Sequence, residues 1–228
     1  MAVAAGRVRL GSRGAPDASK AAILKAAIKE FARGGVAGAR IDAIARAAKV
    51  NKALLYYYYV DKERLYGAAL EEVFRRRYEI LAPILAADIP PGEKVLRYAG
   101  AMFDYFAENP SHREMVQREV MVSSRHGQIL RVFRQQVQPM FEEIVKTVRA
   151  GIESGEFRDV DPLQFTLSMG AVIVQYFSSA PLMKLFLHQD PLTPERLAAR
   201  KAAVLDFISA ALFRHNDSPR RGGAHEPA

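Results

Sequence analysis

The sequence predicts an all-α protein of about nine helices. Apolar residues recur at intervals of three and four along most of the 228 residues, as in helices with one buried face. The polar–apolar alternation of half-buried strands is almost absent. Capping residues, glycines and prolines divide the chain into segments of helical length. We therefore expect a helical protein with a substantial core.

The first quarter of the chain predicts one helix followed by two short ones. The first is expected over 19–33, where a glycine pair follows it as at many helix ends. A short helix over 41–48, a turn of about three residues and a second short helix over 52–58 come next. Two short helices joined by a tight turn behind a longer helix form a helix-turn-helix pattern.

The rest of the chain predicts longer helices. Asp61 is placed to cap the first of them, and Thr193 with Pro194 to start the last. We expect Pro139 to kink its helix and Pro181 to interrupt another. The expected ranges are 62–86, 94–108, 111–122, 125–154, 162–180 and 193–213.

The positive charge is concentrated at one end of the chain. Residues 1–60 contain 11 Lys and Arg against 3 Asp and Glu, whereas residues 61–228 contain 22 of each. A one-sided basic segment is typical of a surface that binds phosphates. Charge alone leaves two interpretations open, namely a nucleic-acid-binding surface and a solubility tail beside a solvated helix face.

Composition and spacing argue against several other classes of protein. The chain has no cysteine, which excludes disulfides and thiolate metal sites and suits a cytoplasmic location. None of its five histidines has a histidine partner three or four residues away, and no catalytic triad stands out, so we expect no metal, cofactor or enzymatic activity. We interpret the apolar runs as interrupted by charges within about 18 residues, and expect no transmembrane helix.

Four consecutive tyrosines, 56–59, cannot all face one core. Neighbours on a helix point about 100° apart. Leu55 and Tyr59 are four residues apart, and we assign both to the buried face. Tyr58 lies at the boundary and stays unassigned. Tyrosine clusters usually belong to a core, but the basic setting favours an outward, DNA-facing role for the opposite face, formed by Lys52, Ala53, Tyr56 and Tyr57.

The stretch RIDAIARAAKVNKALLYYYYVDKERLYGAAL, with EFARGG before it, resembles the DNA-binding signature of the TetR family of transcriptional regulators. The resemblance is specific over residues 19–70. It implies DNA contacts by Arg40, Asn51, Lys52, Ala53, Leu54, Tyr56, Tyr57 and Lys62. Lys49 stands where the family usually has glycine, and a lysine with positive φ costs roughly 1 kcal/mol. Ala53 and Leu54 replace a usual Gly-Thr pair, so base reading leans on apolar contacts.

The resemblance also implies a C-terminal domain that binds an effector and dimerises. The expected regions are a basic tail over 1–17, a DNA-binding domain over 18–64, the C-terminal domain over 65–214 and a disordered tail over 215–228. The candidate ligand-binding residues are Met102, Phe103, Phe106, Met115, Arg118, Met121, Phe133, Met140, Phe141 and Tyr176, although such residues are more often ordinary core. The candidate dimer-interface residues are Phe165, Met169, Val172, Ile173, Leu205, Ile208 and Leu212.

These observations predict a homodimeric regulator, most simply a repressor. It would bind a palindromic double-stranded DNA operator and leave it when a small apolar or amphipathic effector enters the C-terminal domain. Two alternatives remain at this point. One is an effector-independent architectural DNA-binding protein without a ligand cavity. The other is a helical ligand-binding or enzymatic protein whose basic terminus only resembles a DNA reader.

Overall fold

The computed structural model describes residues 16–122 and 131–214. Within these ranges the chain forms nine α-helices and one π-helix, and the β contact found there is an isolated bridge between Phe157 and Phe213. The predicted all-α fold is confirmed. The tails expected over 1–17 and 215–228 lie almost wholly outside the described residues.

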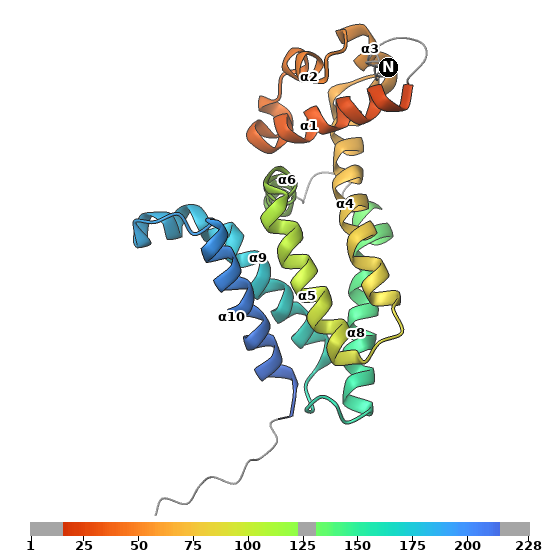
Figure 1. Ribbon diagram of the computed structural model, residues 1–228. Coiled ribbons are helices and arrows are strands. Elements are labelled where there is room, and N and C mark those ends of the chain that lie inside the picture. The colour runs from red at the N-terminus through yellow and green to blue at the C-terminus, as the bar shows by residue number, and fades with distance from the viewer. Residues whose placement is uncertain (1–15, 123–130, 215–228) are drawn as a thin grey trace, which may run out of the picture.

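The N-terminal part is a three-helix unit, drawn at the top of Figure 1. It comprises α1 (Pro16–Gly38), α2 (Ile41–Ala48) and α3 (Lys52–Tyr59). Helix α1 starts earlier than predicted, with Pro16 at its first residue, where a missing N–H costs nothing. Its regular course breaks at Gly35, whose φ of 62° and ψ of −168° are not helical. The sequence predicted that the helix ends at the glycine pair, and in the structure the glycine pair is a break within α1.

A first hydrophobic cluster holds this unit together. Phe31 is fully buried, and its ring meets Tyr66 of the following helix edge-on at 4.9 Å between centroids. Ile44 of α2 and Leu55 of α3 are fully buried in the same cluster. Each short helix thus contributes one anchoring side chain beneath α1.

Helix α4 (Lys62–Ala86) connects the two halves and has the predicted bounds. Asp61 caps it, because its Oδ1 accepts a hydrogen bond from the Arg64 backbone N–H at 2.7 Å. Its first half buries Leu65 and Phe74 in the N-terminal cluster, and its second half buries Leu81 and Leu85 in a second cluster. The helix therefore belongs to two cores at once.

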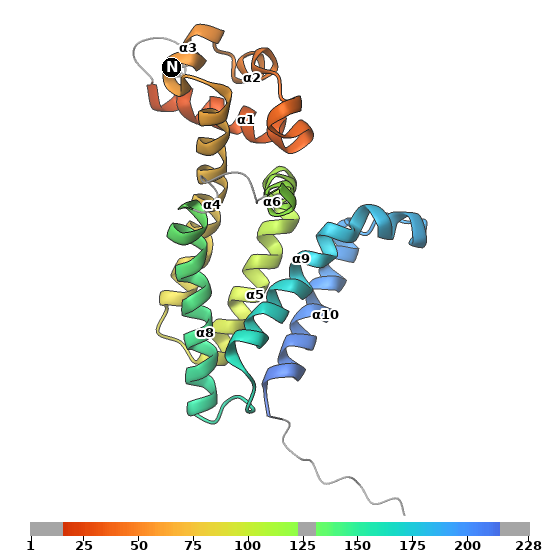
Figure 2. The same ribbon diagram turned by 180° about the vertical axis from the view of Figure 1, so that it is seen from behind.

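The C-terminal part contains the remaining helices, of which α5, α8, α9 and α10 pack around that second cluster, whereas α6 packs against α1 (Figures 1 and 2). Helices α5 and α8 lie beside the lower half of α4, and α9 and α10 form the opposite side. These helices are α5 (Pro91–Glu108), α6 (Pro110–Val122), η1 (Phe133–Val137), α8 (Gln138–Glu153), α9 (Pro162–Leu187) and α10 (Pro194–Leu212).

The helix predicted over 125–154 is irregular in its described part. Residues 123–130 lie outside the described ranges, and a π-helical turn, η1, precedes α8. Pro139 follows this turn by two residues. A proline lacks the N–H for the i−4 carbonyl and its ring presses on that carbonyl, so the wider π turn accommodates it. The structure thus shows a π turn ahead of Pro139, and the kink itself stays a prediction.

Helix α9 corrects the prediction that Pro181 ends it. The helix continues through Pro181 to Leu187, and His188 closes it in a left-handed conformation with φ of 51°. Phe177 and Ala180 are buried just before the proline, so core packing holds this turn in place. Pro181 therefore costs one backbone hydrogen bond without breaking the helix.

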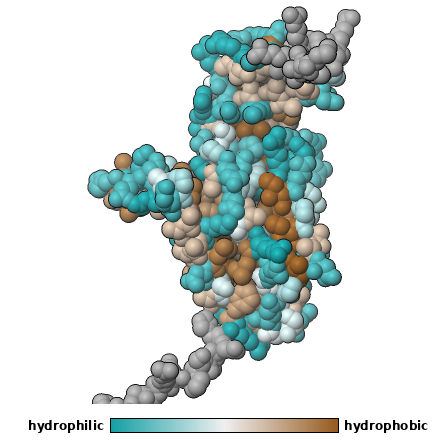
Figure 3. All heavy atoms as spheres, in the orientation of Figure 1, coloured by the Kyte–Doolittle hydropathy of each residue, from teal (hydrophilic) through white to brown (hydrophobic). Residues whose placement is uncertain are grey.

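The reasoning that excluded a membrane-spanning helix was wrong for α9. No charged residue lies between Pro162 and Lys184, and the helix is long and apolar enough to cross a membrane by length and composition. In the fold it packs against α5, α8 and α10, and 22% of its most apolar window is buried. Polar side chains such as Gln164 and Gln175 lie on its exposed side. Apolar surface also gathers over the C-terminal half of the molecule in Figure 3.

The contact between Gly151 and Phe157 generates a stability prediction. A Cβ on Gly151 would overlap the buried Phe157 ring. Gly151→Ala should therefore lower the free energy of unfolding by about 1–2 kcal/mol, as overpacking outweighs the helix-propensity gain. Gly100→Ala is the control, because its nearest neighbour, Lys201 Cε, lies 3.5 Å away. Denaturant unfolding of both variants is the test, and equal stabilities would contradict the packing described.

Candidate nucleic-acid interface and ligand cavity

Helix α3 buries one face and exposes the other. Leu55 is fully buried, whereas Tyr57 is 79% exposed and Tyr56 is 41% exposed. Lys52 and Ala53 are exposed as well. The predicted division of this helix into an inner and an outer face is therefore confirmed. Two phenolic hydroxyls, an ammonium group and a methyl group on one surface can contact phosphates and base edges.

The other two tyrosines of the run pack toward the protein. Tyr58, which the sequence left unassigned, is half-buried, and Lys20 Nζ of α1 lies 5.4 Å from the centre of its ring. Tyr59 is half-buried against the N-terminal cluster. Burial is the main cause that raises the pKa of its phenol to about 12. The Tyr58 ring thus meets α1, and the Tyr59 ring packs on the N-terminal cluster.

Lys52 carries a positive charge on the exposed face of α3. Its Nζ lies 3.0 Å from Asp42 Oδ1 of α2, and this hydrogen bond is the main cause that raises the pKa of Lys52. Both side chains are more than half exposed, so the ion pair contributes little stability. Lys52 can therefore exchange Asp42 for a phosphate at small cost.

The turn between α2 and α3 is built from capping interactions. Lys49 ends α2 in the left-handed conformation, with φ of 57° and ψ of 37°. Lysine thus takes the backbone shape for which the family's glycine is suited, and the turn keeps its geometry. Asn51 caps α3, because its Oδ1 accepts from the Leu54 N–H at 2.6 Å. Arg40, before α2, makes no side-chain cap, and its side chain is exposed.

Lys62 occupies the first residue of α4, where a phosphate contact was expected. Its side chain is half-buried, and its Nζ donates to the Ala37 carbonyl oxygen at 3.3 Å. In this structure it joins the end of α1 to the start of α4.

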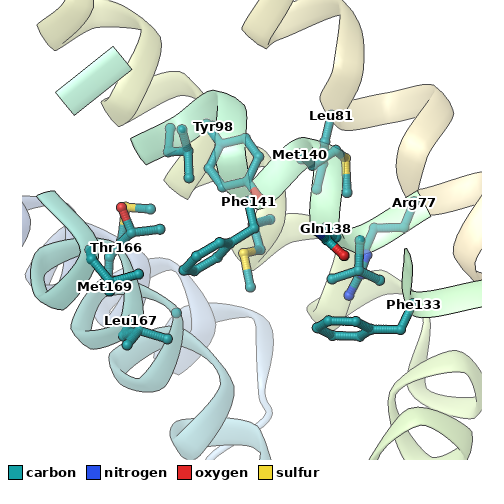
Figure 4. A pocket seen from close by; sticks show the side chains of 15 residues that line it. Arg77, Leu81, Tyr98, Phe133, Gln138, Met140, Phe141, Thr166, Leu167 and Met169 are labelled. Carbon is teal, nitrogen blue, oxygen red and sulfur yellow. The ribbon is translucent and has the colours of Figure 1, made fainter. Parts of the chain in front are cut away.

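A largely apolar cavity of about 470 Å³, partly open to solvent, lies in the C-terminal half (Figure 4). Its volume falls within the range of roughly 300–1,000 Å³ that is usual for small-molecule sites. Helices α4, α5, η1, α8 and α9 supply its walls. The lining residues are Arg77, Leu81, Tyr98, Met102, Phe133, Val137, Gln138, Met140, Phe141, Ile144, Leu163, Thr166, Leu167, Met169 and Gly170.

The candidate ligand-binding residues divide into three groups. Four of them, Met102, Phe133, Met140 and Phe141, line the cavity. Three others, Phe103, Phe106 and Tyr176, lie in the C-terminal cluster. The Phe103 ring lies 5.0 Å from the Phe177 ring between centroids, inclined by 53°, and the Tyr176 hydroxyl donates to the Pro191 carbonyl at 2.6 Å. The remaining three, Met115, Arg118 and Met121, come from α6, and the described side chains of this helix, those up to residue 118, are not part of the wall.

Helix α6 lies between the two halves. Met115 is fully buried in the N-terminal cluster. Arg118 donates from Nε to the Ala32 carbonyl at 2.9 Å and from Nη2 to the Arg33 carbonyl at 2.8 Å. Arg118, a candidate ligand-binding residue, therefore contacts α1 and does not line the cavity. The side chain of Met121 lies outside the described residues.

The sequence did not indicate several of the residues that line the cavity, Arg77 among them. The candidates were chosen as Met and Phe of the middle helices, and the Leu, Ile, Gln and Thr residues of the wall differ in no way from others in the chain. Arg77 ends a run of three arginines, 75–77, on α4. Three neighbours on a helix span about 200°, so such a run can extend from the exposed side to the buried side. Arg75 and Arg76 pair with Glu72 on the surface, and Arg77 is the one that turns inward.

The candidate dimer residues are mostly occupied within the chain. Met169, Ile173, Ile208 and Leu212 are buried in the C-terminal cluster, and Met169 also lines the cavity. Phe165, Val172 and Leu205 are half-buried against the same cluster. The exposed faces of α9 and α10 instead present Leu167, Ala171, Ala203, Phe207 and Ala210. Apolar spacing alone could not separate the two faces, because both are apolar.

Comparison with known sequences places both halves of the chain in one family. Residues 23–69 match the bacterial regulatory proteins of the tetR family, and residues 91–208 match the tetracyclin repressor-like C-terminal domain. The chain belongs to the TetR family. As a member of it, the protein is a DNA-binding transcriptional regulator, with α2 and α3 as its helix-turn-helix.

Similar proteins of the TetR family share most of this chain. It is 31% identical to the HTH-type transcriptional repressor SCO4008 of Streptomyces coelicolor over 172 residues. These residues are 75% of this chain and 84% of that protein. It is 29% identical over 204 residues to the repressor NicS of Pseudomonas putida, covering 87% and 92%. The ketosteroid transcriptional regulator KstR2 of Mycobacterium tuberculosis has the same fold, with a TM-score of 0.70 at 16% identity over 91% of this chain and 100% of that one.

Proposed function

We propose that this TetR-family protein is a homodimeric repressor that binds a palindromic operator and is released by a small effector in the C-terminal cavity. The observation that carries the proposal is that α4 contacts both the DNA-binding unit and the cavity. The same helix packs against the DNA-binding unit through Leu65 and Phe74 and lines the cavity through Arg77 and Leu81. The cavity also favours this function over that of an architectural DNA-binding protein, which needs no such space.

The DNA-binding surface of the proposal is the outer face of α3. Tyr56, Tyr57 and Lys52 would enter the major groove, with Ala53 beside them for apolar contact with thymine methyl groups. Arg40 would reach the phosphate backbone from the start of α2. The relatives named as repressors support the direction of regulation.

The release mechanism follows from how the two halves are joined. An effector can shift the structure only if it binds one arrangement of α4 more tightly than the other. The carbonyl oxygens of Ala32 and Arg33 at the end of α1 are held by Arg118 of α6. We infer that α4 and this α6 contact together transmit a change in the cavity to the DNA-binding unit.

The dimer of the proposal uses the exposed sides of α9 and α10. Phe207 is 56% exposed on α10 and Leu167 is 50% exposed on α9. Ala171, Ala203 and Ala210 around them permit close helix approach. A second copy is needed because two recognition helices must reach major grooves about 34 Å apart.

Substitutions on α3 test the DNA-binding face. With DNA selected from a random library, Tyr57→Ala and Lys52→Ala should each weaken binding about tenfold, and Lys52→Ala should reduce the salt slope by about one. Melting temperatures should stay unchanged because both side chains are exposed. Lys146→Ala on α8, also exposed, is the control. Unchanged DNA binding in both α3 variants would refute this face.

The role of Arg118 is testable with a compound that releases the wild-type chain from DNA. Arg118→Ala should leave DNA affinity and compound affinity within a few-fold of wild type but reduce the effect of the compound on DNA binding at least fivefold. Gln117→Ala, which loses a hydrogen bond to Ser178 instead, is the neighbouring control. A full effect of the compound in Arg118→Ala would show that this contact transmits nothing.

Phe207 offers a test of the dimer. Phe207→Glu should convert a dimer at micromolar concentration into a folded monomer, because a charge would be buried in an apolar interface. Ile80→Glu is the matched control, since Ile80 is 49% exposed on α4, on the other side of the molecule from α10. Sedimentation velocity distinguishes the states. A monomeric wild type, or a dimeric Phe207→Glu variant, would exclude this interface.

A further inference from the structure

Arg77 is a buried positive charge at the wall of the cavity. The residue is 9% exposed, and it is the charged one among the described residues that line the cavity. Its Nε is buried without a hydrogen-bond partner, and the structure shows no ion pair between its guanidinium and a carboxylate of the described residues. Burial lowers the pKa of Arg77, yet arginine stays protonated in proteins.

The chain itself satisfies this guanidinium poorly. The Phe74 ring lies 4.8 Å from its Cζ and stabilises one face of the planar group. The N–H groups at its edge need acceptors, and a buried cation without them is costly. Figure 4 shows the nitrogen atoms of Arg77 on the side of the cavity where Gln138 and Phe133 lie. An acceptor from outside the chain can reach them there.

We propose that the cavity binds an amphipathic anion whose carboxylate pairs with Arg77 and whose apolar body fills the remaining space. This inference rests on the proposed function for the ligand's role as effector. A guanidinium fork matches a carboxylate with two parallel hydrogen bonds. Gln138 stands at the same end and supplies a further polar group. As far as the described residues form them, the other walls are almost entirely apolar and offer no second charge.

The shape of the cavity indicates how the apolar body of the ligand lies in it. In Figure 4, Arg77 and Leu81 come from one side and Thr166, Leu167 and Met169 of α9 from the other. The carboxylate end lies at α4, and the apolar body extends toward α9. The volume of 470 Å³ is about three times that of a cavity of about 150 Å³ that takes one benzene. The body is therefore comparable to two or three fused rings or an acyl chain of similar volume.

The position of the charge on α4 connects binding with regulation. Phe74, which covers the Arg77 guanidinium, is buried in the N-terminal cluster with the DNA-binding helices. A carboxylate that draws Arg77 toward the cavity therefore acts on the stretch of α4 between Phe74, in the N-terminal cluster, and Leu81, in the C-terminal one. A neutral ligand of the same shape lacks this pull and should be the weaker effector.

Matched pairs of acids and neutral analogues test the proposal on the full chain by calorimetry. Dodecanoate is compared with dodecan-1-ol, and 2-naphthoate with 2-naphthamide, all below their aggregation limits. At least one acid should bind at least tenfold more tightly than its neutral partner. If neither acid is preferred, the proposal is overturned. The DNA assays are separate, so a chain that prefers the acid but binds no DNA would refute the proposed function alone.

Variants of neighbouring arginines assign the preference to one side chain. Arg77→Met should remove the preference for the acid, whereas Arg77→Lys should retain part of it. Arg76→Met is the matched control, because Arg76 is exposed and paired with Glu72, and it should keep the full preference. A preference that survives in Arg77→Met would overturn the assignment.

The stability of the ligand-free chain gives a second readout. Because Arg77 is buried without an acceptor, Arg77→Met should raise the melting temperature by about 2 °C or more. This rise would show that the variant folds and that the arginine is not kept for stability. A fall in melting temperature would mean that Arg77 supports the fold, and would count against a ligand-binding role.

Discussion

The whole molecule depends on one helix that is buried in two hydrophobic cores. Helix α4 carries Leu65 and Phe74 into the N-terminal cluster and Leu81 and Leu85 into the C-terminal one. Neither core can lose its part of α4 without exposing apolar surface, since side chains in close-packed interiors leave few alternatives. Helix α4 therefore fixes the position of the DNA-binding face relative to the cavity. Helices α1 and α6 pack against its side.

The same helix shows how stability and binding are balanced in this chain. Along α4, Arg75 and Arg76 are paired with Glu72 at the surface, whereas the Nε of Arg77 is buried without an acceptor among the described residues. An arrangement that costs folding energy in the free protein can be repaid by a ligand that supplies the missing partner. On the outer face of α3, Lys52 can likewise bind a partner from outside the chain. The loss of stability is smaller there, because the Lys52–Asp42 ion pair is exposed and easily exchanged.

Much of the fold followed from local sequence signals, and the departures have physical causes. The bounds of α2 and α4 were predicted because each is closed by local chemistry, the turn at Lys49 and the Asp61 cap. Pro181 was read as a stop, yet the buried turn at Phe177 and Ala180 carries α9 past it. Likewise, Met115 and Arg118 were assigned to a cavity on composition, and packing of α6 against α1 places them elsewhere.

The sequence by itself determined the helix-turn-helix and the outward face of α3. These depend on contacts between residues a few positions apart, on helical angle, caps and local charge. Only the tertiary structure decided which face of α9 and α10 is core, which methionines line the cavity, and which of three adjacent arginines enters it. Those outcomes depend on contacts between helices that are far apart in the sequence. The residues next to an apolar or basic side chain do not show which distant helix it will contact.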